Sequence, residues 1–453
     1  MQGVSVQDAR SSAISSEEFA RLMQPFTPFE PCARIACAVS GGMDSTALLL
    51  LLAQWCRHAG HELLVLTVDH GLRSGSSEEA EAVMRHARSL ELKGRILRWQ
   101  GSKPTRAVQE PARQARYELL SRCCREEAVL HLALAHHAED QAETMGLRLQ
   151  SGSGLMGLAG MSAVRYLPDL RLMRPLLGVP KSRLEATMHQ HGQEWSEDPS
   201  NRDERYRRVQ YRVVLGTGDE GKELTRTLLS TSGVLGRLRA WSEAEIARQL
   251  ACTVAFYSAG YALVHLAALQ DVPDWLWHGI WARLLRTVGG AAYSARKATL
   301  DEARAFLQEK RRMPETVGGC RLKDLGAGRL LVMREPVGLP NVALKPGESQ
   351  SWDGRFRFVR SQDCRVQEAV TVRGLGEHEA ARLWRSVPSL QLSRMPRVTW
   401  ASFPAVFCLD GLLAVPHLNY KCYKMRGKYG ISCAPRPHHS LAESIFRPAV
   451  SGS

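Results

Sequence analysis

Apolar runs alternate with amphipathic stretches along the first half of the chain. Four short runs have the length and composition of buried strands, namely ARIACAV, ELLVLTV, RILRW and VLHLALA. Longer amphipathic segments lie between and after them, from STALLLLLAQWCRHAG to AEDQAETMGLRLQ, and predict helices. Strands that alternate with such helices predict βαβ units, so we expect an α/β domain with a doubly wound parallel sheet over about residues 31–215. Ligands of these sheets bind beyond the carboxyl ends of the strands.

The pattern changes after this region. Glycine and charged residues near 215–223 indicate a linker into a mostly helical middle region, in which GCRLKDLGAGRLLVMRE predicts a hairpin. A second linker, EPVGLPNVALKPGES, leads to a small region of mixed helix and strand. We therefore expect four parts: an N-terminal extension over 1–30, the α/β domain over 31–215, a mostly helical domain over 216–335 and a small α+β domain over 350–453.

Charge and cysteine content narrow the class of protein. The chain of 453 residues carries 60 Lys and Arg against 46 Asp and Glu, a net charge of +14 that favours a polyanionic partner such as nucleic acid. A basic surface without such a partner is the alternative. The 11 cysteines form no C-x-x-C, which argues against a zinc ribbon, a thioredoxin motif and an iron–sulfur cradle. The odd cysteine number, the polar first residues and the lack of a long apolar run predict a cytoplasmic protein without a membrane segment.

The segment AVSGGMDSTALLLLL joins the first predicted strand to the first predicted helix. Its two glycines let the backbone bend closely around a ligand, and the serine hydroxyls and the first helical amides favour a phosphate. A carboxylate here would repel phosphate unless Mg²⁺ lay between them. A plain strand-to-helix turn is the alternative, and a Walker A loop is excluded because no GK[ST] follows. The expected ATP-binding residues are Ser40, Gly41, Gly42, Met43, Asp44 and Ser45.

Acidic residues gather again after the fourth predicted strand. His136, Asp140 and Glu143 are spaced i, i+4 and i+7, so on a helix they would share one face. Asp140 could share a Mg²⁺ with Asp44, and Glu143 could position or deprotonate an incoming amine. Solvated acids at a helix start with a capping histidine are the alternative.

Two groups of arginines could bind anionic ligands. Arg113 and Arg116 lie three residues apart on a predicted helix and could hold the α-phosphate of ATP, or could simply cover apolar neighbours. Arg205, Arg208 and Arg212 are at helical spacing, which gives a basic face for RNA phosphates or a solvated surface.

The loop SGGMDS resembles that of the PP-loop ATP pyrophosphatases, which cleave ATP between the α- and β-phosphates and transfer AMP to an oxygen of the substrate. Further segments in one order resemble the tRNA(Ile)-lysidine synthetase family: VDHGLR, QEPARQARY, AHHAEDQAET, RPLL and EWSEDPSNRDERYRRVQYR. The likeness covers about residues 33–212 and continues weakly in GCRL, WDGRF and LLAVPHL. Glu139 replaces an Asp of the family pattern and Val209 an Asn, while the roles of His70 and Arg73 stay open.

The resemblance implies a PP-loop, HUP-like fold that uses ATP and Mg²⁺, with Asp44 and Asp140 as the metal ligands. It implies adenylation of the wobble cytidine in an isoleucine tRNA with a CAU anticodon, followed by attack of the ε-amine of L-lysine and release of AMP. The two C-terminal domains would bind the tRNA. The oligomeric state is open, a homodimer being one option. The residues expected in catalysis are Asp44, Arg113, His136, Asp140 and Glu143, and those expected on the tRNA are Arg205, Arg208 and Arg212.

Three other functions are compatible with parts of the sequence. A tRNA thiolase is the nearest enzyme, but thiolases with cysteine pairs usually show C-x-x-C, which this chain lacks. A synthetase coupled to an amidotransferase would need a glutaminase elbow, which no cysteine here provides. A catalytically silent RNA-binding protein on the same scaffold is disfavoured, because the expected site residues are intact: Gly41, Gly42, Asp44, Ser45, Asp140 and Glu143.

Overall fold

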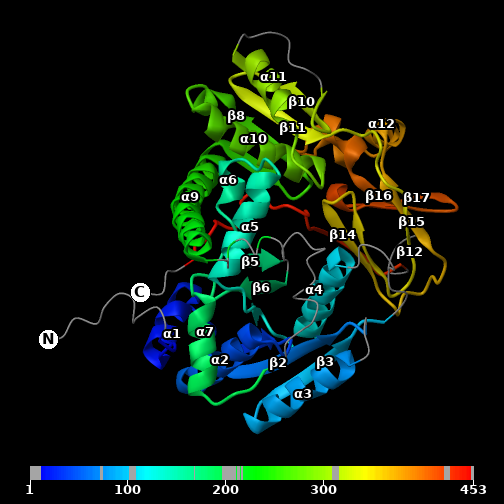
Figure 1. Cartoon of the computed structure of the whole chain (residues 1–453). Helices are drawn as coiled ribbons and strands as arrows, with labels where there is room; N and C mark the ends of the chain where they lie inside the picture. Colours follow the sequence, from blue (N-terminus) through cyan, green and yellow to red (C-terminus); the bar gives the residue numbers. More distant parts are fainter. Residues whose placement is uncertain are drawn as a thin grey trace. The chain divides into compact units, whose positions relative to one another are not determined.

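The computed structural model describes residues 12–71, 75–100, 109–167, 169–195, 211, 215, 218–308, 316–422 and 429–449 (Figure 1). The chain forms two compact units. Unit 1 comprises Met1–Trp241 with Ser444–Ser453, and unit 2 comprises Ser242–Glu443. Among the described helices, none is long and apolar enough to cross a bilayer.

One six-stranded sheet, in the order β3-β2-β1-β4-β6-β5, organises unit 1. Its neighbouring strands are parallel, except that β5 pairs antiparallel with β6. The sequence prediction of a mostly parallel α/β sheet is thereby confirmed. The strands are β1 (Arg34–Ala38), β2 (Glu62–Asp69), β3 (Lys93–Arg98), β4 (His131–Ala133), β5 (Val164–Leu167) and β6 (Leu170–Met173).

Helices cover both faces of this sheet. Alternate residues of β1 point to opposite faces, so Ile35 and Cys37 join the core under α1, α2 and α7, while Ala36 joins the core under α4. Figure 1 shows α3 and α4 on opposite sides of the sheet. The helices of unit 1 are α1 (Ser16–Met23), α2 (Met43–Ala59), α3 (Ser76–Ser89), α4 (Gln109–Glu126), α5 (Ala138–Gln150), α6 (Leu155–Leu158) and α7 (Lys181–Gln190), with the 3-10 turn η2 (Gln24–Phe26).

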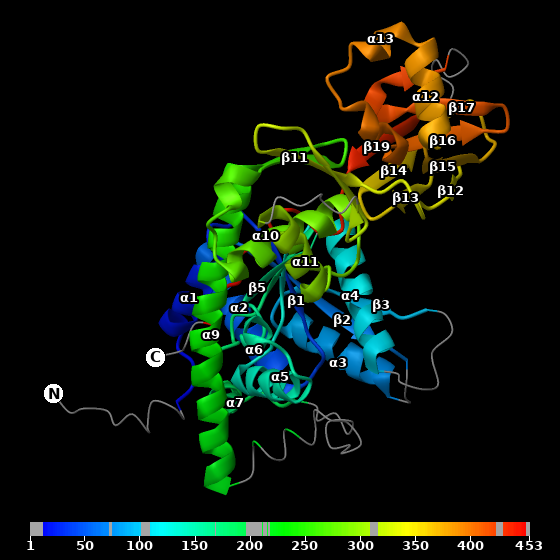
Figure 2. The ribbon, with the colours of Figure 1, turned by 90° about the horizontal axis from the view of Figure 1, so that it is seen from above.

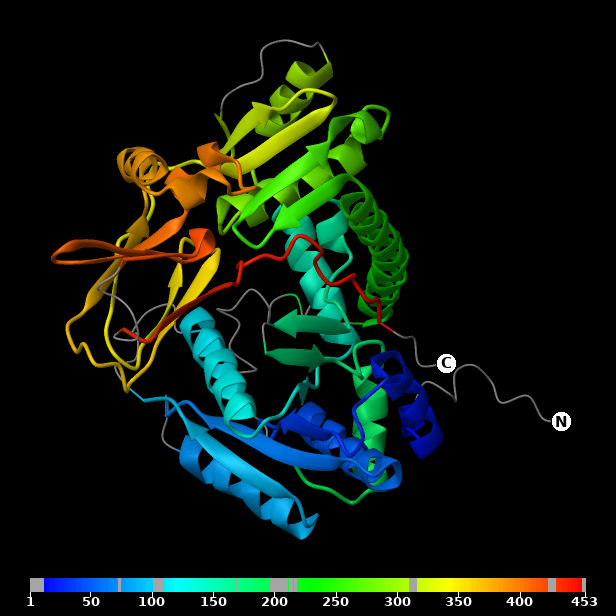
Figure 3. The same ribbon diagram turned by 180° about the vertical axis from the view of Figure 1, so that it is seen from behind.

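The first and the last described segments of the chain both pack into unit 1. Near the N-terminus, Glu18 of α1 forms a buried, two-pronged ion pair with Arg183 of α7, at 2.5 and 2.6 Å. Near the C-terminus, the backbone carbonyl of Arg447 accepts from Ala163 N–H (2.8 Å), and the guanidinium of Arg239 lies over the Phe446 ring. Figure 3 shows this last segment returning along α9 and the β5–β6 edge.

Helix α9 (Gly218–Thr253) crosses the boundary between the units and appears as one uninterrupted helix in Figure 2. The linker expected over 215–223 is therefore wrong from Gly218 onward. The charged residues that suggested a linker, Asp219 and Glu220, lie in the first turn of α9, where acidic side chains favour the helix dipole.

The first half of unit 2 combines helices with a five-stranded antiparallel sheet in the order β7-β8-β11-β10-β9. The predicted hairpin is confirmed, because β10 and β11 pair antiparallel from Cys320↔Arg334 to Asp324↔Leu330. The elements are β7 (Val254–Tyr257), β8 (Tyr261–His265), η4 (Leu266–Leu269), α10 (Asp274–Gly289), α11 (Lys297–Gln308), β9 (Thr316–Val317), β10 (Cys320–Asp324) and β11 (Arg329–Arg334).

The second half of unit 2 holds two further sheets, in the orders β12-β15-β16-β17-β18 and β13-β14-β19. The second predicted linker is wrong in part, because its residues Val342–Leu344 form β12, which pairs with β15. The elements are β12 (Val342–Leu344), β13 (Ser349–Trp352), β14 (Phe356–Arg360), β15 (Val370–Gly374), α12 (Glu377–Ser386), α13 (Pro388–Gln391), η5 (Arg397–Ser402), β16 (Pro404–Cys408), β17 (Gly411–Val415), η6 (Pro416–Leu418), β18 (Tyr420–Lys421) and β19 (Ile431–Pro435).

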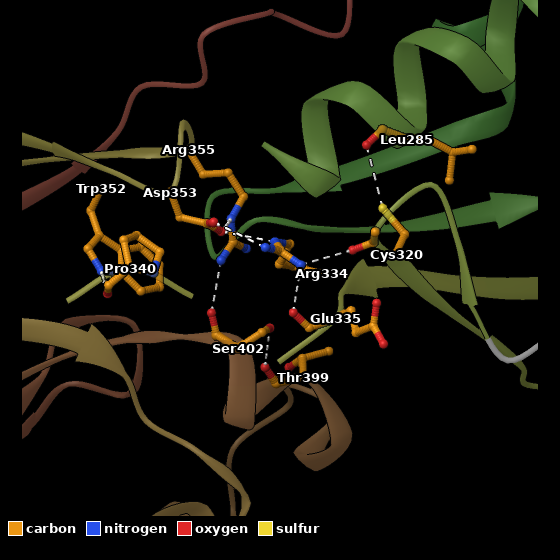
Figure 4. A network of polar contacts seen from close by, with 11 residues as sticks. Leu285, Cys320, Arg334, Glu335, Pro340, Trp352, Asp353, Arg355, Thr399 and Ser402 are labelled. Carbon is orange, nitrogen blue, oxygen red and sulfur yellow. Dashed lines mark hydrogen bonds and ion pairs between the residues drawn. The ribbon is translucent and has the colours of Figure 1, made fainter. Parts of the chain in front are cut away.

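A buried charge cluster joins the two halves of unit 2 (Figure 4). Asp353, in the turn between β13 and β14, accepts from Arg355 at 2.7 Å and from Arg334 of β11 at 3.2 Å. Arg355 also donates to the backbone carbonyl of Ser402 in η5, at 2.9 Å. Burial lowers the pKa of Arg355 to about 10, although the nearby Asp353 carboxylate opposes that shift. Asp353 thus compensates two guanidinium groups that are largely removed from water.

We expect Asp353→Asn to destabilise unit 2 by about 3 kcal/mol, because it leaves two buried guanidinium groups without their counter-charge. The free energy of unfolding, measured by denaturant titration, should fall by this amount. The matched control is Asp363→Asn, since Asp363 is exposed in the same unit. Equal effects of the two substitutions would contradict a special role for the cluster.

Candidate active site

The segment SGGMDS joins β1 to α2, as the sequence predicts, with its last three residues in the first turn of α2. Its own hydrogen bonds hold its shape. Ser40 N–H donates to Ser45 Oγ (3.1 Å), and Ser45 Oγ donates to the Gly42 carbonyl (2.9 Å). Gly42 is the N-cap of α2, and Gly41 has φ +88, which lies in the left-handed region. The serine hydroxyls therefore fold the loop, and the first amides of α2 remain as donors for an anion.

A cavity of about 660 Å³ opens beside this loop, wholly within unit 1. Of the expected ATP-binding residues, all but Gly41 line it. Gly41 instead faces α3, where an added Cβ would lie 3.3 Å from the Val83 side chain. The cavity is large enough for a nucleotide-sized ligand.

Two carboxylates from different helices approach one another at the cavity wall. Asp44 lies in the first turn of α2 and Asp140 in the first turn of α5. Their Oδ2 atoms lie 3.5 and 3.6 Å from the same atom, Nε2 of His137. Asp140 also accepts from the backbone N–H of His137 at 3.1 Å, which closes a capping box at the start of α5.

His137 is charged in this environment. Burial of its ring lowers the pKa, but hydrogen bonds with Asp44 and Glu139 and the charge of Asp140 outweigh burial and raise the pKa to about 10. Only 4% of His137 is exposed, so solvent screens these interactions little. The imidazolium offsets part of the repulsion between the two aspartates.

The donor atoms at this wall suit a hard divalent cation. Among the described residues, no cluster of three or more His, Cys, Asp or Glu side chains is placed to hold a metal by itself. Mg²⁺ ordinarily binds through one or two carboxylates, with waters and substrate phosphates filling its other positions. Asp44 and Asp140, next to a phosphate-binding loop, fit this mode.

Two arginine side chains of α4 line the cavity as well. Arg113 and Arg116 both belong to the lining, and the Arg113 guanidinium lies 5.4 Å from the centre of the Tyr117 ring. Arg116 Nε donates to His70 Nε2 at 3.4 Å. The structure thus places both arginines of the predicted pair in the lining of this cavity, while His70 contacts Arg116 without belonging to the lining.

The remaining predicted residues have different positions. His136 lines the cavity, but the expectation that it shares a helical face with Asp140 and Glu143 is wrong, because α5 begins at Ala138. Glu143 is on α5, is only 2% exposed and does not belong to the lining. Outside the described residues lie Arg73, Arg205, Arg208, Val209 and Arg212.

Several lining residues were missed by the sequence analysis: Glu79, His137, Lys181, Glu185 and Trp195. Two signals could have found some of them. His137 immediately follows His136 at a helix start, where either could have been the cap. Lys181 and Glu185 lie about one turn apart at the start of α7. A helix that begins at Pro180, after a strand, would have placed both side chains near the carboxyl end of that strand.

Known proteins show two kinds of similarity to this chain. The family described as PP-loop domain matches residues 12–217. A tRNA(Ile)-lysidine synthase of Ruegeria pomeroyi is 36% identical, with 85% of this chain and 89% of that protein covered. Another of that name, from Wolbachia pipientis wMel, is 31% identical with the same two coverages, 85% and 89%. Among solved structures, the U34-tRNA thiolase NcsA of Methanococcus maripaludis is 15% identical with a TM-score of 0.40, over 48% of this chain and 78% of that one.

We expect Gly41→Ala to weaken ATP binding roughly tenfold. A side chain at φ +88 is strained by about 1 to 2 kcal/mol, and the loop relieves that strain by moving away from the phosphates. Calorimetric titration with an ATP analogue measures the affinity. Gly60→Ala is the matched control, because Gly60 has φ +70 at the far end of α2 and open space around it. It should lower stability and leave the affinity unchanged.

Proposed function

The chain belongs to the tRNA(Ile)-lysidine synthase family, and we propose that it joins L-lysine to the wobble cytidine of the isoleucine tRNA with a CAU anticodon. The observation that supports this most directly is a single cavity that combines the PP-loop with Asp44, Asp140 and Arg113. ATP use follows from the PP-loop domain. The lysine substrate, the metal and the roles of individual residues are our proposal, and we place the reaction in the cytoplasm.

The first step would activate the base. The carbonyl oxygen of the cytidine attacks the α-phosphorus of ATP, and the bond to the β-phosphate breaks. The leaving pyrophosphate would be bound by the first backbone amides of α2. Arg113 and Arg116 orient the α-phosphate and stabilise the charge that develops on it. Asp44 and Asp140 would hold Mg²⁺, which, when bound, neutralises part of the phosphate charge.

The charges that line the cavity support a cation that accompanies ATP. The lining carries the carboxylates of Asp44, Glu79, Asp140 and Glu185 against the cations Arg113, Arg116, Lys181 and His137. These charges nearly balance before ATP binds. The triphosphate would then bring several further negative charges next to Asp44 and Asp140, and a divalent cation between them would neutralise part of that charge.

The second step would form the new bond. The neutral ε-amine of lysine attacks the activated carbon of the base, the carbon–oxygen bond to AMP breaks, and the amine gives up a proton to a carboxylate. Glu143, the acid expected to receive the amine, is buried and outside the cavity lining, whereas Asp140 belongs to the lining. We therefore assign the contact with lysine to Asp140 and give Glu143 the supporting position.

The tRNA must present the wobble base out of its stack for this chemistry. Arg205, Arg208 and Arg212 remain our candidates for contacts with its phosphates, because they lie only 10 to 17 residues after the cavity residue Trp195 in the sequence. A thiolase is less well supported, since the relatives that match most of the chain carry the lysidine synthase name and the sequence holds no C-x-x-C.

The test is incorporation of labelled L-lysine into a tRNA transcript with ATP and Mg²⁺. We expect incorporation into the isoleucine tRNA with a CAU anticodon and none into the methionine tRNA with the same anticodon. Asp140→Asn should lower the rate at least about 10²-fold, the usual loss when a charge-stabilising group is removed from an active site. Pyrophosphate release without lysine incorporation would point to another nucleophile.

A further inference from the structure

The carboxylate of Glu139 lies next to the cavity and contacts residues on two of its sides. Glu139 does not belong to the cavity lining, yet both of its oxygens have partners there. The backbone N–H of Lys181, at the start of α7, donates to Oε1 and Oε2 at 3.1 and 3.0 Å. On the other side, Oε2 lies 2.9 Å from Nδ1 of His137.

The contact with His137 leads directly to the two aspartates. The imidazole is a rigid ring, so a partner on Nδ1 also fixes where Nε2 points. Nε2 faces Asp44 Oδ2 at 3.5 Å and Asp140 Oδ2 at 3.6 Å. The ring is buried, so water screens these polar contacts little. Glu139, His137 and the two aspartates thus form one continuous chain from α7 to α2.

The same carboxylate also fixes the first residue of α7. Pro180 is the N-cap of α7, and proline has no N–H of its own, so Lys181 carries the first free amide of the helix. Glu139 accepts from that amide. The side chains of Lys181 and Glu185, which line the cavity, project from this anchored turn.

We infer that Glu139 is a positioning residue for the nucleotide site: through His137 it sets the placement of the Asp44 and Asp140 carboxylates, and through the Lys181 amide it sets the facing wall. It does not touch the cavity, so it acts only through these neighbours. The inference rests on the proposed function for its link to Mg²⁺ and ATP. It assigns a role to one of the two residues at which this sequence departs from the family pattern.

A carboxylate suits this position better than an amide of the same size. Glu139 meets hydrogen-bond donors on both sides, and a carboxylate offers acceptors only. Oε2 accepts from both neighbours, and Oε1 accepts from the Lys181 amide a second time. In Glu139→Gln an NH₂ group replaces one of these two acceptors, so at least one of the three hydrogen bonds is lost, and the negative charge beside His137 is lost with it. Glu139→Asp retains both acceptor oxygens and the charge, with a side chain one methylene shorter.

The experiment measures binding, so that it does not depend on tRNA or lysine. A non-hydrolysable ATP analogue is titrated calorimetrically into each variant over a series of Mg²⁺ concentrations. For Glu139→Gln, the Mg²⁺ concentration that gives half-maximal tightening should rise about tenfold or more, as happens when a residue that supports a metal ligand is replaced. Affinity in EDTA should change less than about twofold. Glu139→Asp should recover most of the Mg²⁺ response.

The matched control is Glu62→Gln. Glu62 forms an exposed ion pair with Arg34 at the start of β2, the opposite end of the sheet from the cavity. It should behave as the wild type in every titration. The thermal midpoint of each variant shows that the comparison is between folded proteins.

A double-mutant cycle tests whether Glu139 acts through His137. If it does, Glu139→Gln in a His137→Asn background should add little to the loss that His137→Asn causes alone. Fully additive losses would overturn the inference, as would an unchanged Mg²⁺ response in Glu139→Gln or an equal loss in Glu139→Asp. Failure of lysine incorporation, by contrast, would overturn the proposed function and leave this binding result standing.

Discussion

The site depends on an electrostatic constraint, because three carboxylates must lie close together beside a loop built for phosphate. Asp44, Glu139 and Asp140 all contact one buried imidazole, and like charges at such distances repel strongly unless a cation lies among them. His137 supplies that cation in the protein itself. The amino-terminal ends of α2 and α5 add the favourable ends of two helix dipoles. The position of this ring therefore governs how closely the acids can approach.

The topology of the sheet explains why these groups meet. The chain builds β1, β2 and β3 toward one edge and then returns to place β4 on the other side of β1. Crevices form at such reversals, because the connections after the two neighbouring strands leave in opposite directions. Helix α2 follows β1 and α5 follows β4, so Asp44 and Asp140 begin neighbouring helices at this reversal.

Much of this arrangement could be predicted from the sequence, and the failures have physical causes. The loop around Gly41 and the acid at 140 follow from short-range patterns of strand, turn and helix. The adjacency of β1 and β4 depends on pairing between residues about a hundred positions apart, which a single sequence does not reveal. His137 was missed because His136 was placed on the helical face of Asp140 and Glu143, although the residue that directly precedes the predicted helix AEDQAETMGLRLQ is His137. Strand β12 was missed because its three residues gain their stability from β15 and not from local preference.

Unit 2 shows that the same chemistry of buried charge can serve stability alone. Asp353 lies between Arg334 and Arg355 with only 8% of its side chain exposed, much as His137 lies among acids in unit 1. An ion pair such as Arg34–Glu62, with side chains 36% and 62% exposed, contributes little because water screens it. The two buried clusters differ in whether a ligand can reach them. The groups around Asp353 have protein partners, whereas Asp44 and Asp140 line a cavity of about 660 Å³ that a ligand can enter. A buried charge cluster therefore points to function in this chain only where it borders such a space, and this criterion distinguishes Asp140 from Asp353.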